Sequence, residues 1–346
     1  MAKRYKKKLK VFGVPWHTAH QADLAKLPWV ESYDLVINPY RSWATVHRPF
    51  PDNCNMVTSF EAGKYDYAIL HVDQQSIYNP DEGDRISKGR LFSEIKETIE
   101  REDPDLPIFV INHNTPFHDK YESEKVVDII KELIGKHEMI VNSHQSRKQW
   151  GWGATIVHGM DVDEWWDLPK EPRVVVSLSP AGMEKSYRRV FLRSVRQLLA
   201  DKGIPFVWIG VEKKFNTFAA YRDFLGRSLV YFHPAWQSPM PRARTEAMLS
   251  GSCVVTTPYQ DADSFIKDGV NGFLTSKETY KDPRIMDSPE YTANLIEKLI
   301  VETPDLAQKV GQEGRKTARK LFNRKNFADQ WEKYLVERGV LCLEEK

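Results

Sequence analysis

Hydrophobic residues along this chain gather in short runs that alternate with longer amphipathic segments. The runs are rich in Val and aromatic residues, which is typical of buried strands, and the segments between them repeat apolar residues at helical spacing. Strands are predicted at residues 9–14, 34–38, 66–72, 107–112, 139–142, 173–178, 205–210, 229–232, 252–257 and 273–274. Helices are predicted at residues 90–101, 123–134, 245–250, 304–322 and 324–338. This alternation favours an α/β fold with parallel sheets.

The alternation is interrupted near the middle of the chain, where Pro169 and Pro172 fall in a stretch without periodicity. At 346 residues, the chain is about twice the length of a typical domain. We therefore predict two Rossmann-like domains, at residues 1–160 and 173–322. An interdomain linker is predicted at residues 161–172 and a C-terminal helical segment at residues 323–346.

The composition is typical of a soluble globular protein, with 41% hydrophobic and 28% charged residues. The mean hydropathy is -0.53, and we expect no transmembrane segment because no apolar run is long enough. The N-terminus lacks the apolar stretch of a signal peptide, and the three cysteines are widely separated. These features predict a cytoplasmic location. The net charge of +2 indicates no general attraction to nucleic acid.

Candidate chemistry gathers after the apolar run at residues 229–232. Arg242, Arg244 and Glu246 stand where a predicted strand leads into the helix at 245–250. The N-terminus of a helix carries unpaired amides and the positive end of the helix dipole, so a diphosphate can bind there. Glu246 is then a candidate to accept hydrogen bonds from ribose hydroxyls.

This segment resembles the donor-binding signature of the retaining GT-B glycosyltransferases of family four. In that signature, a strand ending in Pro leads to E-x7-E, then A-M-x-x-G and a short Val-rich strand. Glu246 matches the second glutamate, and Ser238 stands where the family usually has the first. The resemblance spans roughly residues 108–334. It includes the segments IVNS at 140–143, IVHGMD at 156–161 and DGVNGFL at 268–274.

The resemblance implies a GT-B fold, in which two Rossmann-like domains have parallel sheets facing a central cleft and the last helix crosses back to the N-terminal domain. It also implies retaining transfer of a hexose from a nucleotide diphosphate-sugar, a UDP-hexose, to a hydroxyl of a glycan, a lipid-linked intermediate or a small metabolite. No cofactor and no metal are implied, because fixed cations and a helix end stabilise the leaving diphosphate. Asp-x-Asp tripeptides begin at Asp103, Asp161 and Asp261, but none follows a convincing buried strand.

A second motif bears on the diphosphate. Residues 174–185 are similar to the strand, loop and lysine of the family, v-G-R-x-x-x-x-K-G, whose arginine and lysine neutralise the donor. Lys185 matches the lysine, while the arginine position falls on Ser179 or Pro180.

Other arginines are candidates to replace the missing charge, since a guanidinium binds phosphate oxygens bidentately. Arg188 and Arg189 lie at the start of the following helix, where a solvated helix face is an equally good interpretation. Arg242 and Arg244 are favoured for this role, because they are expected in the loop that the diphosphate contacts.

The N-terminal half is expected to bind the acceptor, and it contains seven of the ten tryptophans and nine of the ten histidines. His113 matches the histidine that the family places at a strand end beside the reacting sugar; a structural loop histidine is the alternative. His17 and His20 follow the first predicted strand, where the family usually has a glycine-rich loop, and are candidates for acceptor or donor contact. Asp73 is a further loop candidate.

Two other functions stay open. The basic run at residues 3–10, the Trp-rich N-terminal half and the altered donor motif fit a phage-type DNA glycosyltransferase that acts on hydroxymethylated pyrimidine, with modified DNA as the partner. Such a run is also typical of a solvated terminus. Ser238 and the missing arginine fit a catalytically weak nucleotide-sugar-binding protein on a GT-B scaffold.

Overall fold

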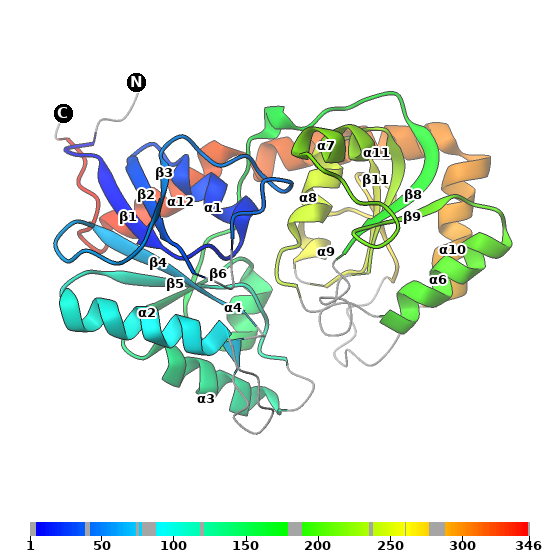
Figure 1. Cartoon of the computed structure of the whole chain (residues 1–346). Helices are drawn as coiled ribbons and strands as arrows, with labels where there is room; N and C mark the ends of the chain where they lie inside the picture. The colour runs from blue at the N-terminus through cyan, green and yellow to red at the C-terminus, as the bar shows by residue number, and fades with distance from the viewer. Residues whose placement is uncertain are drawn as a thin grey trace. The chain divides into compact units, whose positions relative to one another are not determined.

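The computed structural model of the chain divides into two compact units (Figure 1). Unit 1 contains Met1–Gly159 and Arg324–Lys346, and unit 2 contains Met160–Asn323. The structure describes residues 5–38, 42–73, 76–77, 88–117, 121–178, 189–234, 238–259, 261–276 and 288–344. The predicted α/β class with parallel sheets is confirmed, because each unit contains one sheet whose strand pairs are parallel.

Unit 1 contains a seven-stranded sheet of order β3-β2-β1-β4-β5-β6-β7. Its strands are β1 (Leu9–Gly13), β2 (Val30–Val36), β3 (Cys54–Val57), β4 (Tyr67–Val72), β5 (Ile108–Asn112), β6 (Glu138–Val141) and β7 (Ala154–Thr155). Its helices are α1 (Thr18–Ala25), α2 (Lys88–Glu102), α3 (Ser123–Ile134), α4 (His144–Trp150) and α12 (Arg324–Val336). Every residue of β4 and β5 is buried, because helices cover both faces of the sheet.

The two faces of this sheet belong to different hydrophobic clusters. One cluster joins the sheet to α1 and α12, from which Leu24, Phe327 and Trp331 contribute buried side chains. The other joins it to α2 and α3, from which Phe92 and Ile130 contribute. In Figure 1, α1 and α12 lie on the opposite side of the strands from α2 and α3. The C-terminal helix therefore completes the core of the unit that the N-terminal residues begin.

Unit 2 contains a five-stranded sheet of order β12-β11-β10-β8-β9. Its strands are β8 (Glu171–Ser177), β9 (Phe206–Ile209), β10 (Ser228–His233), β11 (Cys253–Thr256) and β12 (Phe273–Leu274). Its helical segments are η3 (Val162–Glu164), α6 (Arg189–Asp201), α7 (Phe218–Gly226), α8 (Arg242–Leu249), α9 (Ala262–Phe265), α10 (Pro289–Glu297), η4 (Lys298–Glu302) and α11 (Pro304–Leu321). Helices α6, α10 and α11 contribute to one core cluster with the central strands.

The structure differs from the predicted elements where the local pattern is weak. Strand β2 begins at Val30, four residues before the predicted start. The prediction left out residues 30–33 because Glu31 and Ser32 are polar. The strand includes them because this segment pairs with β1. Strand β3 was not predicted, since it is short and half-exposed at the edge of the sheet. Helix α7 was also missed, although Thr217 caps it by accepting the amide of Ala220 at 3.1 Å.

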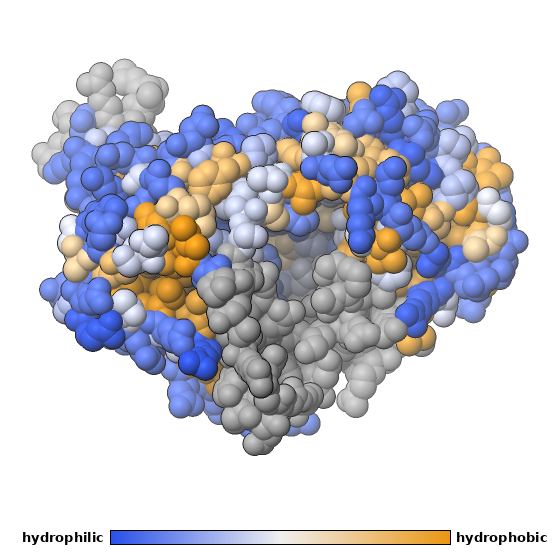
Figure 2. Space-filling view, in the orientation of Figure 1, coloured by the Kyte–Doolittle hydropathy of each residue, from blue (hydrophilic) through white to orange (hydrophobic). Residues whose placement is uncertain are grey.

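The outer surface carries most of the charged residues. In Figure 2 the visible face is predominantly hydrophilic, with hydrophobic residues interspersed. Within the part of the chain that the structure describes, none of the helices combines the length and the apolar character that crossing a lipid bilayer requires.

Helix α11 packs against the turn between α8 and β11 without an intervening side chain at Gly311. A Cβ atom at Gly311 would overlap the carbonyl oxygen of Gly251 and lie 3.0 Å from the amide nitrogen of Cys253. Both are backbone atoms held by their own elements, so neither can move aside cheaply.

Gly311→Ala is therefore expected to lower the free energy of unfolding by about 1–3 kcal/mol. In a solvent-exposed helix that contacts no other backbone, the same change would raise the free energy of unfolding by about 0.5–1 kcal/mol. The sign of the change therefore shows whether α11 contacts the turn. Urea denaturation measures it, with the exposed Gln308→Ala on the same helix as the control. Stabilisation by Gly311→Ala would show that α11 does not approach this turn.

Candidate functional site

Helix α8 presents the residues of the donor-like motif of unit 2. The chain leaves β10 at His233, and Pro241 precedes α8 in an extended conformation, with φ -62° and ψ 114°. The helix begins at Arg242, three residues before the predicted start. Arg242 and Arg244 therefore lie in the first turn of α8 and not in the loop before it, which corrects their predicted location. A proline suits this start because the first amides of a helix have no partner within it.

Glu246 is almost completely buried in α8, with 5% of its surface exposed. Its Oε2 accepts a hydrogen bond from the hydroxyl of Tyr221, on α7, at 2.8 Å. The pKa of Tyr221 is raised well above its ordinary value by burial and then by the charge of Glu246, so this hydroxyl stays protonated and keeps donating. A carboxylate has about four acceptor positions, of which Tyr221 occupies one. Tyr221 thus fixes the orientation of Glu246.

Arg244 is fully buried in the same helix. Its guanidinium carbon lies 5.1 Å from the centre of the Phe265 ring, and Nη2 lies 3.5 Å from Sδ of Met240. The pKa of His233, at the end of β10, is lowered well below its ordinary value by burial and then by the charge of Arg244. His233 is therefore neutral near pH 7, and Arg244 supplies the local positive charge.

The remaining predicted donor residues lie in different surroundings. Arg242 is half-buried as a residue, whereas Arg244 is fully buried, and Nε and Nη1 of the Arg242 guanidinium are buried. Ser238 is also half-buried and lies at the start of the segment that leads into α8. Ser179, Lys185 and Arg188 lie outside the described residues. Arg189 is described as the first residue of α6.

Unit 1 gathers four histidines at the carboxyl ends of β1, β4 and β5. His17 is the N-cap residue of α1, His20 lies within α1, His71 lies in β4 and His113 follows β5. The rings of His17 and His113 are 3.9 Å apart between centroids, and that of His20 lies 5.4 Å from His113. The structure therefore brings together His17, His20 and His113, the histidines predicted as candidates of this half.

His71 connects directly to His113. Nδ1 of His71 lies 2.9 Å from Nε2 of His113, and Nδ2 of Asn142 lies 3.3 Å from Nδ1 of His113. Which ring nitrogen donates in each of these two contacts depends on the tautomers of the two imidazoles. Burial and then the charge of His17 lower the pKa of His71 well below its ordinary value. His71 is therefore neutral near pH 7, and its contact orients the ring of His113.

Exposure separates the four histidines into two pairs. His20 and His71 are buried, whereas His113 is half-exposed and His17 is exposed. Ligands bind at the carboxyl ends of strands in open α/β sheets. His17 and His113 are therefore the members of the cluster that a bound molecule can contact.

Two functional candidates were missed by the sequence reasoning. His71 interrupts the otherwise apolar strand 67–72, and a histidine inside a buried strand is a signal that could have been used. Tyr221 carries no comparable signal, because α7 itself was not predicted. The predicted candidate Asp73 accepts a hydrogen bond from the indole of Trp16 at 3.2 Å, beside this cluster. Among the described residues, no group of three or more His, Cys, Asp or Glu is arranged to hold a metal ion.

The neutral state of His71 makes stability depend on pH. Its pKa is lower in the folded protein than the ordinary value of 6.5, so the unfolded chain takes up the extra proton as the pH falls. The stability contributed by the neutral form is complete above pH 6.5 and is lost below it. His71→Asn keeps a hydrogen-bond acceptor without the titration.

We expect the wild type to lose about 1.4 kcal/mol more unfolding free energy than His71→Asn between about pH 7.5 and pH 5.5. Urea denaturation at both pH values measures this difference. Equal pH dependence of the two proteins, or a His71 imidazole that titrates near pH 6.5 by NMR, would contradict the neutral assignment.

Comparisons with known proteins bear on the fold of the chain. No family model matches the chain. An uncharacterized glycosyltransferase from Methanocaldococcus jannaschii is 27% identical over 181 residues, which cover 52% of this chain and 41% of that protein. The match thus spans about two fifths of the length of this curated relative.

Solved structures match over nearly the whole chain. Anabaena Alr3699/HepE in complex with UDP-glucose aligns with a TM-score of 0.64 and 15% identity, covering 95% of this chain and 100% of that one. Sucrose-phosphate synthase from Thermosynechococcus elongatus aligns with a TM-score of 0.62 and 13% identity, covering 96% and 99%. At these identities the likeness establishes the fold: the chain has the α/β GT-B fold, with two Rossmann-like parallel sheets.

Proposed function

We propose that this protein is a retaining glycosyltransferase of the family four type. It moves a hexose from UDP-hexose to a hydroxyl of a glycan, a lipid-linked intermediate or a small metabolite, without a metal ion. The observation that carries this proposal is the Tyr221-oriented Glu246 beside the first turn of α8, at the carboxyl end of a parallel sheet. The fold shared with a UDP-glucose complex and the partial match to a glycosyltransferase support it.

The donor would bind at α8. The amides of its first turn and the positive end of its dipole face the position proposed for the diphosphate. Arg242 adds a full charge there, and Glu246 accepts from the ribose hydroxyls. Ser238 offers a hydroxyl in place of the usual carboxylate, while Ser179, Lys185, Arg188 and Arg189 keep their predicted role in binding the diphosphate. Negative charge grows on the departing UDP, so the positive end of α8 and the charge of Arg242 stabilise the transition state more than the bound donor.

His113 would contact the reacting sugar in unit 1. Its ring is held by His71 on one side and by Asn142 on the other, so its position is set before a substrate arrives. The imidazole of His113 can hydrogen-bond to sugar hydroxyls. His17, at the exposed end of the cluster, is proposed as a further contact.

The donor assignment is tested by the pair Glu246→Gln and Tyr221→Phe. Glu246→Gln removes the charge that strengthens the ribose hydrogen bonds, and we expect about tenfold weaker UDP-glucose binding or more. Tyr221→Phe leaves the carboxylate but not its orientation, so about three- to tenfold is expected. Isothermal titration calorimetry measures both, with the half-exposed Glu313→Gln on α11 as the control. Unchanged affinity for UDP-glucose in both variants would contradict the assignment of donor binding to α8.

The acceptor assignment is tested by His113→Ala. We expect kcat for transfer to fall about 100-fold, because a positioned contact to the reacting sugar is lost, while the Kd for UDP-glucose changes less than about twofold. The exposed His144→Ala on α4 is the control and should keep both values. If only the Kd for UDP-glucose changed and kcat did not, His113 would contribute to donor binding and not to the transfer step.

The reaction itself is tested by incubating the protein with a panel of nucleotide-sugars and following release of the nucleotide diphosphate. Acceptors include glycans, lipid-linked sugars, small metabolites and duplex DNA with hydroxymethylated pyrimidines. NMR of the product gives the anomeric configuration, and an α-linked product from an α-linked donor is the retaining outcome. Binding of UDP-glucose without turnover on any acceptor would favour a nucleotide-sugar-binding protein instead.

A further inference from the structure

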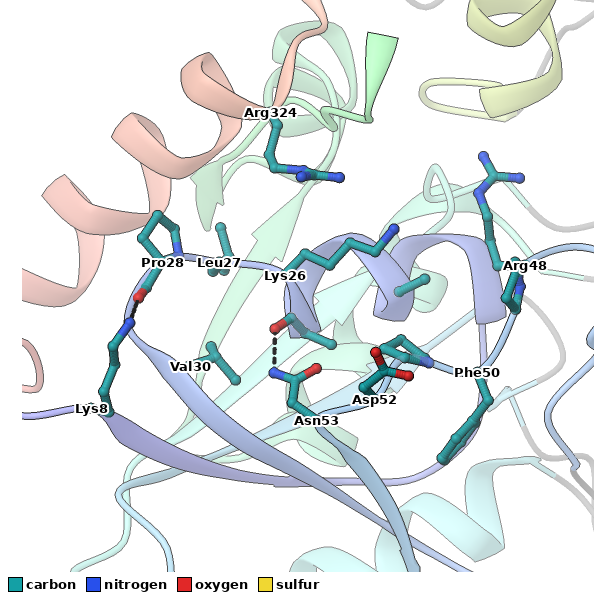
Figure 3. Close-up of a pocket in the computed structure, with 14 residues that line it drawn as sticks. Lys8, Lys26, Leu27, Pro28, Val30, Arg48, Phe50, Asp52, Asn53 and Arg324 are labelled. Atoms are coloured by element: carbon teal, nitrogen blue, oxygen red, sulfur yellow. Dashed lines mark hydrogen bonds between the residues drawn. The ribbon is translucent and has the colours of Figure 1, made fainter. Parts of the chain in front are cut away.

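Unit 1 contains a cavity of about 600 Å³ that the proposed glycosyl transfer does not use. It lies beside α1, between the turn that follows this helix, the segment 48–53 and the first residue of α12 (Figure 3). The cavity shares no lining residue with the histidine cluster. Its volume is within the range of pockets that hold small organic molecules.

The lining of this cavity is strongly basic. Lys8, Lys26, Arg48 and Arg324 contribute to it, and Asp52 is the single carboxylate among the described lining residues. In Figure 3 the charged ends of Lys26, Arg48 and Arg324 extend to the same side of α1. Charges of one sign around a concave site of low dielectric focus their field into it. The charge of the lining therefore favours an anion over a cation in this cavity.

The dipoles of the neighbouring helices do not determine the sign of the electrostatic field in the cavity. Arg324 begins α12, whose N-terminus carries a partial positive charge, while Lys26 is the C-cap residue of α1, whose end carries a partial negative charge. These contributions are about half a charge each and oppose one another. The full charges of the four side chains therefore dominate.

The shape and chemistry of the lining select one class of anion. Arginine guanidinium groups match phosphate oxygens bidentately, and the two arginines come from separate elements. A bare phosphate fills only a small part of about 600 Å³. Leu27, Val30 and Phe50 provide apolar walls for the rest of a ligand, and an aromatic face packs well against a sugar ring or a base.

We propose that this cavity binds an organic phosphate with a ring-containing body, such as a sugar phosphate or a nucleotide. The phosphate lies among Lys26, Arg48 and Arg324, and the rest of the ligand packs against the apolar part of the lining. This inference does not depend on the proposed transfer reaction, because it involves no residue of the donor or acceptor sites.

The walls of the cavity are held in place before a ligand binds. Asn53 Nδ2 donates to the carbonyl oxygen of Ala25 at 2.7 Å, which fixes the segment 48–53 against α1. The indole of Trp43 donates to the carbonyl oxygen of Arg48 at 2.8 Å, and its ring meets that of Phe50 edge-on at 5.1 Å between centroids. Little conformational entropy is therefore lost on binding.

The test titrates the full-length protein with ribose 5-phosphate and with deoxycytidine 5′-monophosphate by isothermal titration calorimetry. Ribose and deoxycytidine are the phosphate-free controls, and we expect them to bind at least about tenfold more weakly. The two phosphates separate a sugar phosphate from a nucleotide as the preferred ligand. A Glu246→Gln background shows whether the nucleotide binds at α8 instead.

Lys26→Gln/Arg324→Gln is expected to weaken phosphate binding about tenfold or more, since two charged contacts are lost. Lys325→Gln, at the exposed residue beside Arg324, should change it less than about twofold. Lys8→Gln/Lys26→Gln repeats the test at two exposed positions, and circular dichroism verifies folding. The proposal is overturned by equal affinity of wild type and both double variants, by equal weakening in Lys325→Gln, or by equal binding of the phosphate-free compounds.

Discussion

Parallel strand pairing is the constraint on which the candidate sites of this protein depend. In a parallel sheet, the strand interiors use their backbone groups in the ladder, and the carboxyl ends of all strands lie at one edge. Side chains far apart in the sequence are therefore brought to the same edge. In unit 1 this gathers His17, His71 and His113 from the ends of three strands, and in unit 2 it places His233 beside the helix that carries Glu246.

Both units use burial to keep a histidine neutral at this edge. His71 lies near the charge of His17, and His233 lies near the charge of Arg244. A second positive charge in either place would be repelled in surroundings of low dielectric. His71 and His233 consequently act as neutral hydrogen-bonding groups beside the charges of His17 and Arg244 respectively.

The basic cavity of unit 1 does not depend on strand ends, unlike the other candidate sites. Its residues come from a turn, a proline-rich segment and the start of the last helix, so no sequence motif indicates the cavity. Lys8 belongs to the basic run near the N-terminus that the sequence alone could not assign. Tertiary contacts bring this lysine together with Lys26, Arg48 and Arg324 around one concave site.

The sequence by itself determined the α/β class, most of the central strands and the segment that carries Glu246. These depend on hydrophobic periodicity and on local turn and helix preferences, which act over a few residues. Only the tertiary structure decided the edge strand β3, the pairing of Glu246 with Tyr221, the link between His71 and His113, and the burial of Arg244. Each of these arises from contacts between segments distant in the chain, and side-chain orientation and desolvation are set by those contacts rather than by neighbouring residues.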